Sequence, residues 1–368
     1  MRKVRILVVD DSVVVRRLLT TILSAEPDFE VVGAAADGTI GLAKITQVNP
    51  DIVTMDVEMP GMSGLETLVE IRKRFPNLPV LMFSSRTETA ARTTLEAIAL
   101  GATDYVTKPS GTGSREASEE HVRAQLVPRI RELGARADAL SGSSPAHRRV
   151  TPIRTTVRRT DVAPSPVDVL AIGASTGGPN ALTAMLAAIP KTLACPVVIV
   201  QHMPPIFTRL FAERLSVVSQ LSVVEAVGGE VMQAGRAYVA PGDHHLRVVR
   251  EGAVVRCAID RAPPENSCRP AVDVLFRSVA AVFGARSLAV VLTGMGQDGL
   301  RGAEHLKEAG AQIVVQDERS SVVWGMPGII ARAGLADAIL PLPEIAQDVL
   351  RRVALHRGAR PREVSRVD

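Results

Sequence analysis

Short apolar runs alternate with longer stretches of helical periodicity along most of this 368-residue chain. Between residues 4 and 133, five runs of strand length each precede a stretch in which apolar residues recur every three or four positions. The expected strands cover residues 4–9, 31–35, 52–55, 80–83 and 105–107, and the expected helices cover residues 13–25, 38–47, 64–75, 87–100 and 116–133. Five such repeats predict a doubly wound parallel sheet with helices on both faces.

The same alternation returns between residues 168 and 350. The expected strands cover residues 169–172, 197–200, 223–227, 238–240, 288–292 and 313–315, and the expected helices cover residues 179–189, 206–216, 271–283, 300–309 and 342–355. Residues 245–257 have the pattern of a hairpin. We therefore expect an α/β protein with two doubly wound parallel-sheet domains, the second Rossmann-like with an antiparallel hairpin at one edge.

Residues 134–166 separate the two patterns. They lack sustained apolar periodicity and are rich in Ser, Pro, Thr and Arg, so they cannot bury enough surface to order themselves. We expect a first domain over residues 1–126, a linker over 127–166, a second domain over 167–355 and a basic tail over 356–368.

Composition and charge limit the compartment and the partners that we expect for this chain. The formal net charge is +4, and the excess of arginine lies in residues 148–159 and 351–368. We interpret these two segments as solvated spacers in preference to nucleic-acid-binding arms. Three irregularly spaced cysteines describe neither a disulfide framework nor a zinc site, which favours a reduced, cytoplasmic protein. No stretch approaches the roughly 20 apolar residues of a membrane span. We expect no nucleic-acid partner and no membrane insertion.

Polar side chains follow four of the five strands expected in the first domain. Asp10 and Asp11 follow the first strand, Asp56 the third, Ser84 the fourth and Lys108 the fifth. The carboxyl ends of parallel strands share one sheet edge, so these groups should cluster, and clustered carboxylates favour Mg²⁺. A carboxylate between Mg²⁺ and a lysine suits a phosphoryl acceptor. Taken alone, the Asp10-Asp11 pair would only start a helix.

Residues 4–125 resemble a response-regulator receiver domain through the segments VVDDS, DIVTMDVEMPGMSG, MFSS and YVTKP. The resemblance implies a flavodoxin-like fold and phosphorylation of Asp56 by a chemotaxis histidine kinase. It implies a Mg²⁺ site for phosphorylation made by Asp10, Asp11, Asp56 and the carbonyl of Val57. It also implies that Ser84 and Lys108 sense the phosphate and that Tyr105 is a rotating aromatic switch.

In the second domain, three apolar runs each end at one reactive side chain: Ser175, His202 and Asp298. A hydroxyl, an imidazole and a carboxylate at strand ends are the parts of a nucleophile, base and orienting acid. Gly173 to Gly177 fit the G-x-S-x-G pattern of a nucleophile at a strand-to-helix turn, where free N–H groups can stabilise an oxyanion. These features predict a serine hydrolase, although the order Ser, His, Asp departs from that of G-x-S-x-G hydrolases.

Each of the three segments also has a simpler interpretation. The glycine-rich turn could bind a phosphate, His202 could be a packed strand-end residue, and Asp298 could cap the next helix. Only the coincidence of all three at successive strand ends favours catalysis.

Residues 168–340 resemble the chemotaxis protein-glutamate methylesterase (CheB) family through IGASTGGP, QHMPP, YVAPGDHH, RPAVDVLF and LTGMGQDG. The resemblance implies a phosphorylation-activated hydrolase that removes methyl groups from glutamate γ-methyl esters of chemoreceptor cytoplasmic domains and releases methanol. It also implies deamidation of selected receptor glutamines, and both reactions would serve adaptation in bacterial chemotaxis. No cofactor is implied for ester hydrolysis.

The same resemblance assigns Ser175 as the nucleophile, His202 as general base and then acid, and Asp298 as the residue that orients His202. Backbone N–H groups near Met295, with Thr176 nearby, would stabilise the oxyanion. Cys268 stands where the family often has a histidine, so its role stays open. Two other functions stay open as well: the same hydrolase mechanism on a protein outside chemotaxis, or a response regulator whose output binds DNA or a partner without catalysis.

Overall fold

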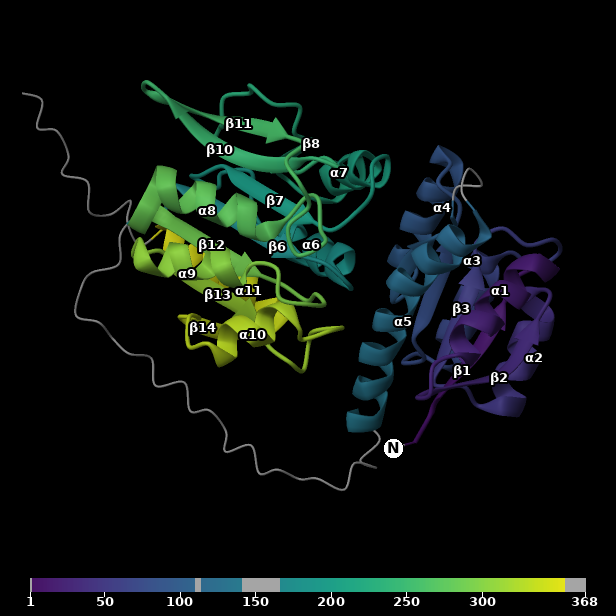
Figure 1. The fold of residues 1–368 in the computed structure, drawn as a ribbon. Coiled ribbons are helices and arrows are strands. Elements are labelled where there is room, and N and C mark those ends of the chain that lie inside the picture. Colours follow the sequence, from purple (N-terminus) through teal and green to yellow (C-terminus); the bar gives the residue numbers. More distant parts are fainter. Residues whose placement is uncertain (1, 110–113, 141–165, 355–368) are drawn as a thin grey trace, which may run out of the picture. The chain divides into compact units, whose positions relative to one another are not determined.

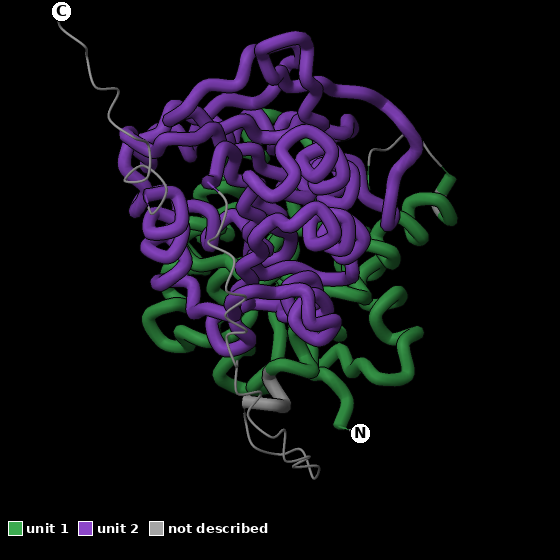
Figure 2. The backbone as a smooth tube through the Cα atoms, turned by 90° about the vertical axis from the view of Figure 1, so that its left-hand side faces the viewer, with its two compact units in different colours: residues 1–152 green, residues 153–368 purple. Residues whose placement is uncertain are grey.

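The structure is a computed structural model that describes residues 2–109, 114–140 and 166–354. It divides into two compact units, Met1–Pro152 and Ile153–Asp368, which Figure 2 distinguishes by colour. Each unit is built on a parallel β-sheet flanked by helices, so the expected α/β class with two doubly wound sheets is confirmed.

The first unit contains one five-stranded parallel sheet in the order β2-β1-β3-β4-β5; β1, β2 and β3 are labelled in Figure 1. Its strands are β1 (Val4–Val9), β2 (Phe29–Ala35), β3 (Ile52–Asp56), β4 (Val80–Ser84) and β5 (Asp104–Thr107). Its helices are α1 (Val13–Ser24), α2 (Gly38–Val48), α3 (Gly64–Arg74), α4 (Glu88–Ala99) and α5 (Arg115–Leu140). Helix α1 packs against α5, while α3 packs between α2 and α4, so helices cover both faces of the sheet.

Local sequence signals fix where these helices begin. The Ser63 side chain accepts a hydrogen bond from the Glu66 N–H, and Glu66 reaches back to the Ser63 N–H, which forms a capping box at α3. Asp37 and Thr87 cap α2 and α4 through their side chains in the same way. The strands between them are apolar and almost wholly buried, as expected for a sheet covered on both faces.

Helix α5 extends further than the sequence predicted. The pattern predicted a helix over residues 116–133, and α5 continues to Leu140, into the segment that we expected to belong to the linker. Val127, Ile130 and Leu133 recur on one face of the helix and are buried, with exposed fractions of 5 %, 0 % and 2 %. Gly134 allows the helix to lie against Val4, whose side chain a Cβ there would meet at 2.5 Å. Packing against the first unit therefore keeps this segment helical; the rest of the predicted linker and the predicted tail lie outside the described residues.

The second unit contains a seven-stranded parallel sheet in the order β14-β13-β12-β6-β7-β9-β8. Its strands are β6 (Val169–Ala174), β7 (Val197–Gln201), β8 (Ser222–Glu225), β9 (Arg236–Val239), β12 (Ser287–Val291), β13 (Gln312–Gln316) and β14 (Ala338–Leu340). Its helices are α6 (Gly178–Ala187), α7 (Phe207–Val218), α8 (Val272–Phe283), α9 (Leu300–Glu308), α10 (Met326–Arg332) and α11 (Leu342–Ala354), with a short 3₁₀ helix over Gly284–Arg286. Helices α8, α9 and α10 share one apolar core with the sheet, and α6 packs between α7 and α11.

The predicted antiparallel hairpin is confirmed as β10 (His245–Glu251) and β11 (Val254–Asp260). The two strands form a sheet of their own and pack on α8, instead of extending the edge of the seven-stranded sheet. The sequence patterns missed β14 and α10. The first has only three half-buried residues, and the second has seven residues that include Pro327 and Gly328; neither is long enough to display a period.

The register of the second sheet brings three chain segments to one edge. Ala174, the last residue of β6, pairs with Gln201, the last residue of β7, and Gly173 pairs with Val291 of β12 on the other side. The residues that follow β6, β7 and β12 therefore leave the sheet side by side. This is the edge at which open α/β sheets place their ligand sites.

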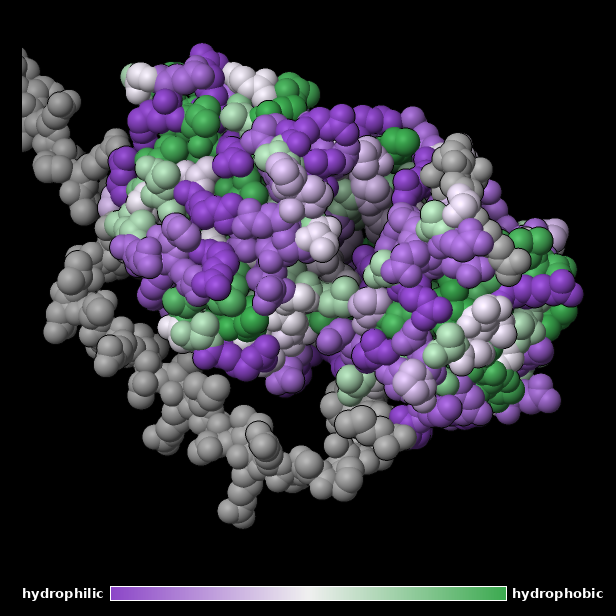
Figure 3. Space-filling model, in the orientation of Figure 1, coloured by the Kyte–Doolittle hydropathy of each residue, from purple (hydrophilic) through white to green (hydrophobic). Residues whose placement is uncertain are grey.

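The surface of the described chain is mixed in character. On the face shown in Figure 3, hydrophobic residues of the second unit occur in small groups among hydrophilic ones. Within the described ranges, no helix is both long and apolar enough to cross a bilayer.

Candidate functional site

Ser175 lies at the carboxyl edge of the second sheet, immediately after β6. Its backbone N–H donates to the Thr293 carbonyl at 3.1 Å, and its own carbonyl accepts from Gly178 N–H at 2.7 Å at the start of α6. Gly177 between them has φ +76°, a conformation that favours glycine. The turn holds Ser175 at the base of α6 with only 8 % of the residue exposed.

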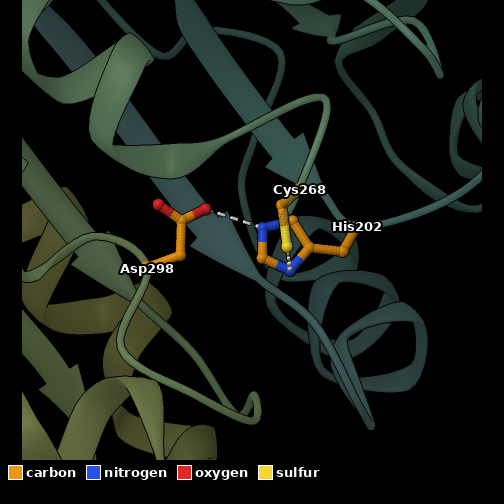
Figure 4. Close-up of side chains that lie close together, drawn as sticks. All are labelled: His202, Cys268 and Asp298. Carbon is orange, nitrogen blue, oxygen red and sulfur yellow. Dashed lines mark hydrogen bonds and ion pairs between the residues drawn. The ribbon is translucent and has the colours of Figure 1, made fainter. Parts of the chain in front are cut away.

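His202 follows β7 beside Ser175, and its backbone N–H donates to the Ala174 carbonyl at 3.2 Å. The ring atom Nε2 lies 2.8 Å from Oδ2 of Asp298, which comes from the loop between β12 and α9 (Figure 4). The structure therefore joins the predicted base to the predicted orienting acid. Because Nε2 is engaged by the carboxylate, Nδ1 is the ring nitrogen left to take up a proton.

The Asp298 carboxylate is held by a set of donors and is only 2 % exposed. Oδ2 accepts from Val272 N–H at 2.6 Å, and Oδ1 accepts from the N–H groups of Asp273 and Gly299, both at 3.0 Å. The first two donors belong to the amino-terminal turn of α8, where the helix dipole favours a negative charge. Burial raises the pKa of Asp298, but the hydrogen bonds from His202 and these backbone groups lower it by more, so the residue stays ionised.

Cys268 lies on the opposite side of the His202 ring. Its Sγ is 3.6 Å from Nδ1, the nitrogen that faces away from Asp298 (Figure 4). Burial lowers the pKa of His202, but the charges and hydrogen bonds of Cys268 and Asp298 outweigh burial and raise it to about 10. The imidazole therefore holds its proton more tightly than a free histidine does.

The predicted oxyanion region adjoins Ser175. Thr176 is 2 % exposed, and its carbonyl accepts from the Thr293 hydroxyl at 2.9 Å. Gly294 packs directly on the serine, because a Cβ there would lie 3.0 Å from the Ser175 Cβ and 3.1 Å from its N. Met295 follows Gly294 and is half-buried, so its backbone stands next to the predicted nucleophile.

A second cluster lies at the carboxyl edge of the first sheet. Lys108 Nζ is 2.8 Å from Oδ2 of Asp56 and 3.4 Å from Oδ2 of Asp10. Burial raises the pKa of Asp56 to about 6, with the charge of Asp10 adding to the rise and Lys108 opposing it. Burial likewise raises the pKa of Asp10, and Lys108 opposes the shift. Asp56, the predicted phosphoryl acceptor, is therefore a buried carboxylate whose negative charge Lys108 only partly neutralises.

This cluster fits the Mg²⁺ site that the sequence predicts. Ligand atoms of Asp10, Asp11 and Asp56 lie within 4.8 Å of one another, and the buried Oδ2 of Asp10 has only its 3.4 Å ion pair with Lys108 among the described residues. All-oxygen sites of this kind suit Mg²⁺. The Val57 carbonyl accepts from Gly64 N–H at 3.1 Å, and a carbonyl oxygen retains a second lone pair for a cation.

The predicted phosphate-sensing residues flank Asp56. Ser84 is fully buried, and its hydroxyl accepts from the Thr94 hydroxyl at 2.6 Å and donates to the Ser85 carbonyl at 3.1 Å. Tyr105, the predicted switch residue, is 7 % exposed on β5. The structure thus places Asp10, Asp56, Ser84 and Lys108 at the ends of four neighbouring strands.

Sequence reasoning missed three residues of the second site. Gln201 is buried and donates through Nε2 to the carbonyls of Ser175 at 3.0 Å and His202 at 3.3 Å, which links the backbones of the predicted nucleophile and the predicted base. Asn266 donates to Oδ1 of Asp298 at 3.0 Å, and Gly294 packs against Ser175. Only Gln201 had a signal in the sequence, because it is a polar residue at the end of the apolar run VVIVQ. Asn266 and Gly294 lie in loops, whose sequences show no periodicity.

Comparisons with known families agree with the two units. The family model described as CheB methylesterase matches residues 170–349, and the model described as response regulator receiver domain matches residues 6–115. The first match includes all three residues of the predicted triad, and the second includes Asp56 and Lys108.

Individual proteins are similar over nearly the whole chain. A protein-glutamate methylesterase/protein-glutamine glutaminase of Trichodesmium erythraeum is 51% identical over 96% of this chain and 100% of its own length. A protein of the same description from a Nocardioides species is 49% identical, over 96% of each chain. The crystal structure of the Thermotoga maritima CheB methylesterase catalytic domain matches with TM-score 0.50 and 38% identity, over 51% of this chain and 99% of that one.

Proposed function

We propose a regulated ester hydrolase for this chain, which belongs to the protein-glutamate methylesterase/protein-glutamine glutaminase family. The proposed reactions are hydrolysis of glutamate γ-methyl esters on chemoreceptor cytoplasmic domains, with release of methanol, and deamidation of selected receptor glutamines. The His202–Asp298 pair, beside a serine held in a strand-to-helix turn, carries this proposal. Together the reactions would adjust receptor signalling during adaptation in chemotaxis.

In the proposed mechanism, the Ser175 hydroxyl attacks the ester carbonyl carbon while Nδ1 of His202 accepts its proton. His202 then returns that proton to the leaving methoxide, methanol departs, and an acyl-enzyme remains. A water molecule, deprotonated in turn by His202, attacks the acyl carbon, and His202 then returns that proton to the Ser175 oxygen as the bond to the glutamate side chain breaks. Asp298 keeps the second proton on Nε2 and stabilises the imidazolium. With a glutamine substrate, ammonia leaves in place of methanol.

The negative charge that develops on the substrate oxygen needs donors close to Ser175. The backbone N–H groups near Met295 and the region of Thr176 are the proposed donors, because Gly294 holds that loop against the serine. Donors fixed by packing stabilise the transition state without reorganising, and one such donor typically contributes about 10²–10³-fold in rate.

We propose Asp56 as the phosphorylation site that raises hydrolysis. A histidine kinase is the phosphoryl donor that a receiver domain implies in general, and a chemotaxis kinase is the specific donor proposed here. Asp10, Asp11, Asp56 and the Val57 carbonyl would hold Mg²⁺, which supplies charge compensation for the phosphoryl group when bound. Lys108 already contacts Asp56 and would pair with the phosphate, and the Ser84 hydroxyl would donate to it. We place these events in the cytoplasm.

The experiment that tests the hydrolase assignment measures methanol release from methylated receptor cytoplasmic fragments. Ser175→Ala should abolish release while the circular dichroism spectrum and melting temperature stay unchanged. Ser222→Ala, which removes an exposed hydroxyl at the start of β8, is the matched control and should keep full activity. Release by Ser175→Ala at the rate of the unaltered chain would rule out the proposed nucleophile.

A separate test addresses the receiver site. Incubation with a small-molecule phosphoryl donor and Mg²⁺ should add one phosphate, which mass spectrometry would detect as a mass increase of the chain. Asp56→Asn should not be labelled, whereas Glu30→Gln, which removes an exposed carboxylate on β2, should be labelled normally. Equal labelling of the Asp56→Asn variant would exclude Asp56 as the acceptor.

A further inference from the structure

Cys268 gives the catalytic centre a donor set that a serine hydrolase does not require. The thiol, the His202 imidazole and the Asp298 carboxylate have ligand atoms within 4.8 Å of one another (Figure 4). Thiolate and imidazole are the donors that Zn²⁺ and Cd²⁺ prefer, whereas Mg²⁺ prefers oxygen. This cluster therefore favours Zn²⁺ or Cd²⁺, whereas the carboxylates of the first unit favour Mg²⁺.

The spacing of the two softer donors matches a metal site. Zinc–sulfur bonds measure about 2.3 Å and zinc–nitrogen bonds about 2.0–2.1 Å, so a tetrahedral ion separates the two ligands by about 3.6 Å. Sγ of Cys268 and Nδ1 of His202 are 3.6 Å apart. An ion could replace the sulfur–nitrogen contact without movement of either side chain, and water would complete its coordination.

Asp298 completes this arrangement from the far side of the ring. Its hydrogen bond to Nε2 at 2.8 Å leaves Nδ1 as the nitrogen that faces the thiol of Cys268. Backbone N–H groups of Val272 and Asp273 hold the carboxylate itself in place. A histidine that binds zinc through one nitrogen and a carboxylate through the other is a recurrent feature of zinc sites.

We propose that His202 and Cys268 bind a soft divalent cation, Zn²⁺ or Cd²⁺, and that the bound ion inhibits ester hydrolysis. Inhibition rests on the function proposed above, because the ion takes the Nδ1 lone pair that accepts the serine proton. Binding rests only on the two ligands and their spacing. The two parts of the proposal are therefore tested by separate readouts.

Binding is tested on the reduced full-length chain in excess Mg²⁺, which occupies the carboxylates of the first unit. Titration with Cd²⁺ should give an ultraviolet thiolate-to-metal absorption that saturates at one equivalent, and Zn²⁺ should displace it. Cys268→Ser should abolish the absorption and weaken Zn²⁺ binding by at least about 100-fold, the upper end of losses seen even for residues that only support ligands. Cys257→Ala removes a buried thiol instead and should leave both signals intact.

Inhibition is tested with the same chains and the same titration. Stoichiometric Zn²⁺ should suppress methanol release from the unaltered chain at least 10-fold, and the Cys268→Ser and Cys268→Ala variants should resist it. An absorption that persists in Cys268→Ser would overturn the metal site while leaving the hydrolase assignment standing. Zinc bound through Cys268 without loss of hydrolysis would overturn the inhibition and, with it, the role of His202 as base.

Discussion

Replacement of Asp298 by asparagine should leave the catalytic centre folded but disable its base. The carboxylate accepts from His202 Nε2 and Val272 N–H through Oδ2, and from Asp273 N–H and Gly299 N–H through Oδ1. An amide has one oxygen. If its NH₂ takes the Oδ1 position, the N–H groups of Asp273 and Gly299 and the side-chain amide of Asn266 lose their acceptor; if it takes the Oδ2 position, only the Val272 N–H does.

The second orientation is therefore favoured by about two buried hydrogen bonds. This orientation lowers the free energy of unfolding by about 1–3 kcal/mol, because the Val272 N–H stays buried without a partner. It also presents an N–H to Nε2 of His202, which must then accept instead of donate. The remaining proton moves to Nδ1, the nitrogen that should receive the proton of Ser175. A triad histidine left in the wrong tautomer typically costs about 10⁴-fold in rate.

Two assays on one protein sample check both effects: methanol release from methylated receptor fragments, and unfolding in urea. Asp273→Asn is the matched control, since Asp273 is also buried and accepts from Gly302 N–H at 2.6 Å but does not contact His202. It should keep a rate within about 10-fold of the unaltered chain, well short of the 10⁴-fold tautomer effect. If Asp298→Asn matched that control in rate, the tautomer argument would be refuted.

Three further predictions follow from individual contacts. Gly294→Ala should cost about 1–3 kcal/mol and about 10²-fold in rate, because the new Cβ would lie 2.4 Å from Met326 Sδ and 3.0 Å from the Ser175 Cβ; urea unfolding and methanol release measure the two. Cys268→Ala, assayed with a chelator, should shift the acid limb of the rate–pH profile to lower pH, because Cys268 raises the pKa of His202; an unmoved limb would mean that the thiol does not act on the ring. Asp56→Asn in Mg²⁺-free buffer should stabilise the first unit at pH 8 by up to about 3 kcal/mol and by less than about 1 kcal/mol at pH 4, as measured by denaturant unfolding. The sign follows because burial raises the pKa of Asp56 from 3.8 to about 6, so the folded state loses stability as pH rises through that interval.

The strand ends and their chemistry could be predicted from the sequence because parallel sheets display apolar runs of fixed length. Ser175 and His202 end two such runs, and the order of strands then places them side by side. Asp298 was found for the same reason, although it lies several residues beyond β12.

Loop geometry could not be predicted in that way. Asn266 and Ser267 have φ of 51° and 60°, in a region that side chains rarely adopt, and this turn carries Asn266 to Asp298 and Cys268 to His202. No periodicity encodes such a turn. The last turns of α5 were missed because residues 134–140, GARADAL, do not continue the apolar period that ends at Leu133.

The central claim is that Ser175 hydrolyses receptor methyl esters under the control of Asp56. The most direct measurement is methanol release from methylated receptor fragments, with and without a small-molecule phosphoryl donor and Mg²⁺, for the unaltered chain, Ser175→Ala and Asp56→Asn. The account predicts release that requires Ser175 in both conditions and rises with the donor only when Asp56 is present. Release that persists in Ser175→Ala, or that rises equally with the donor in Asp56→Asn, would contradict it.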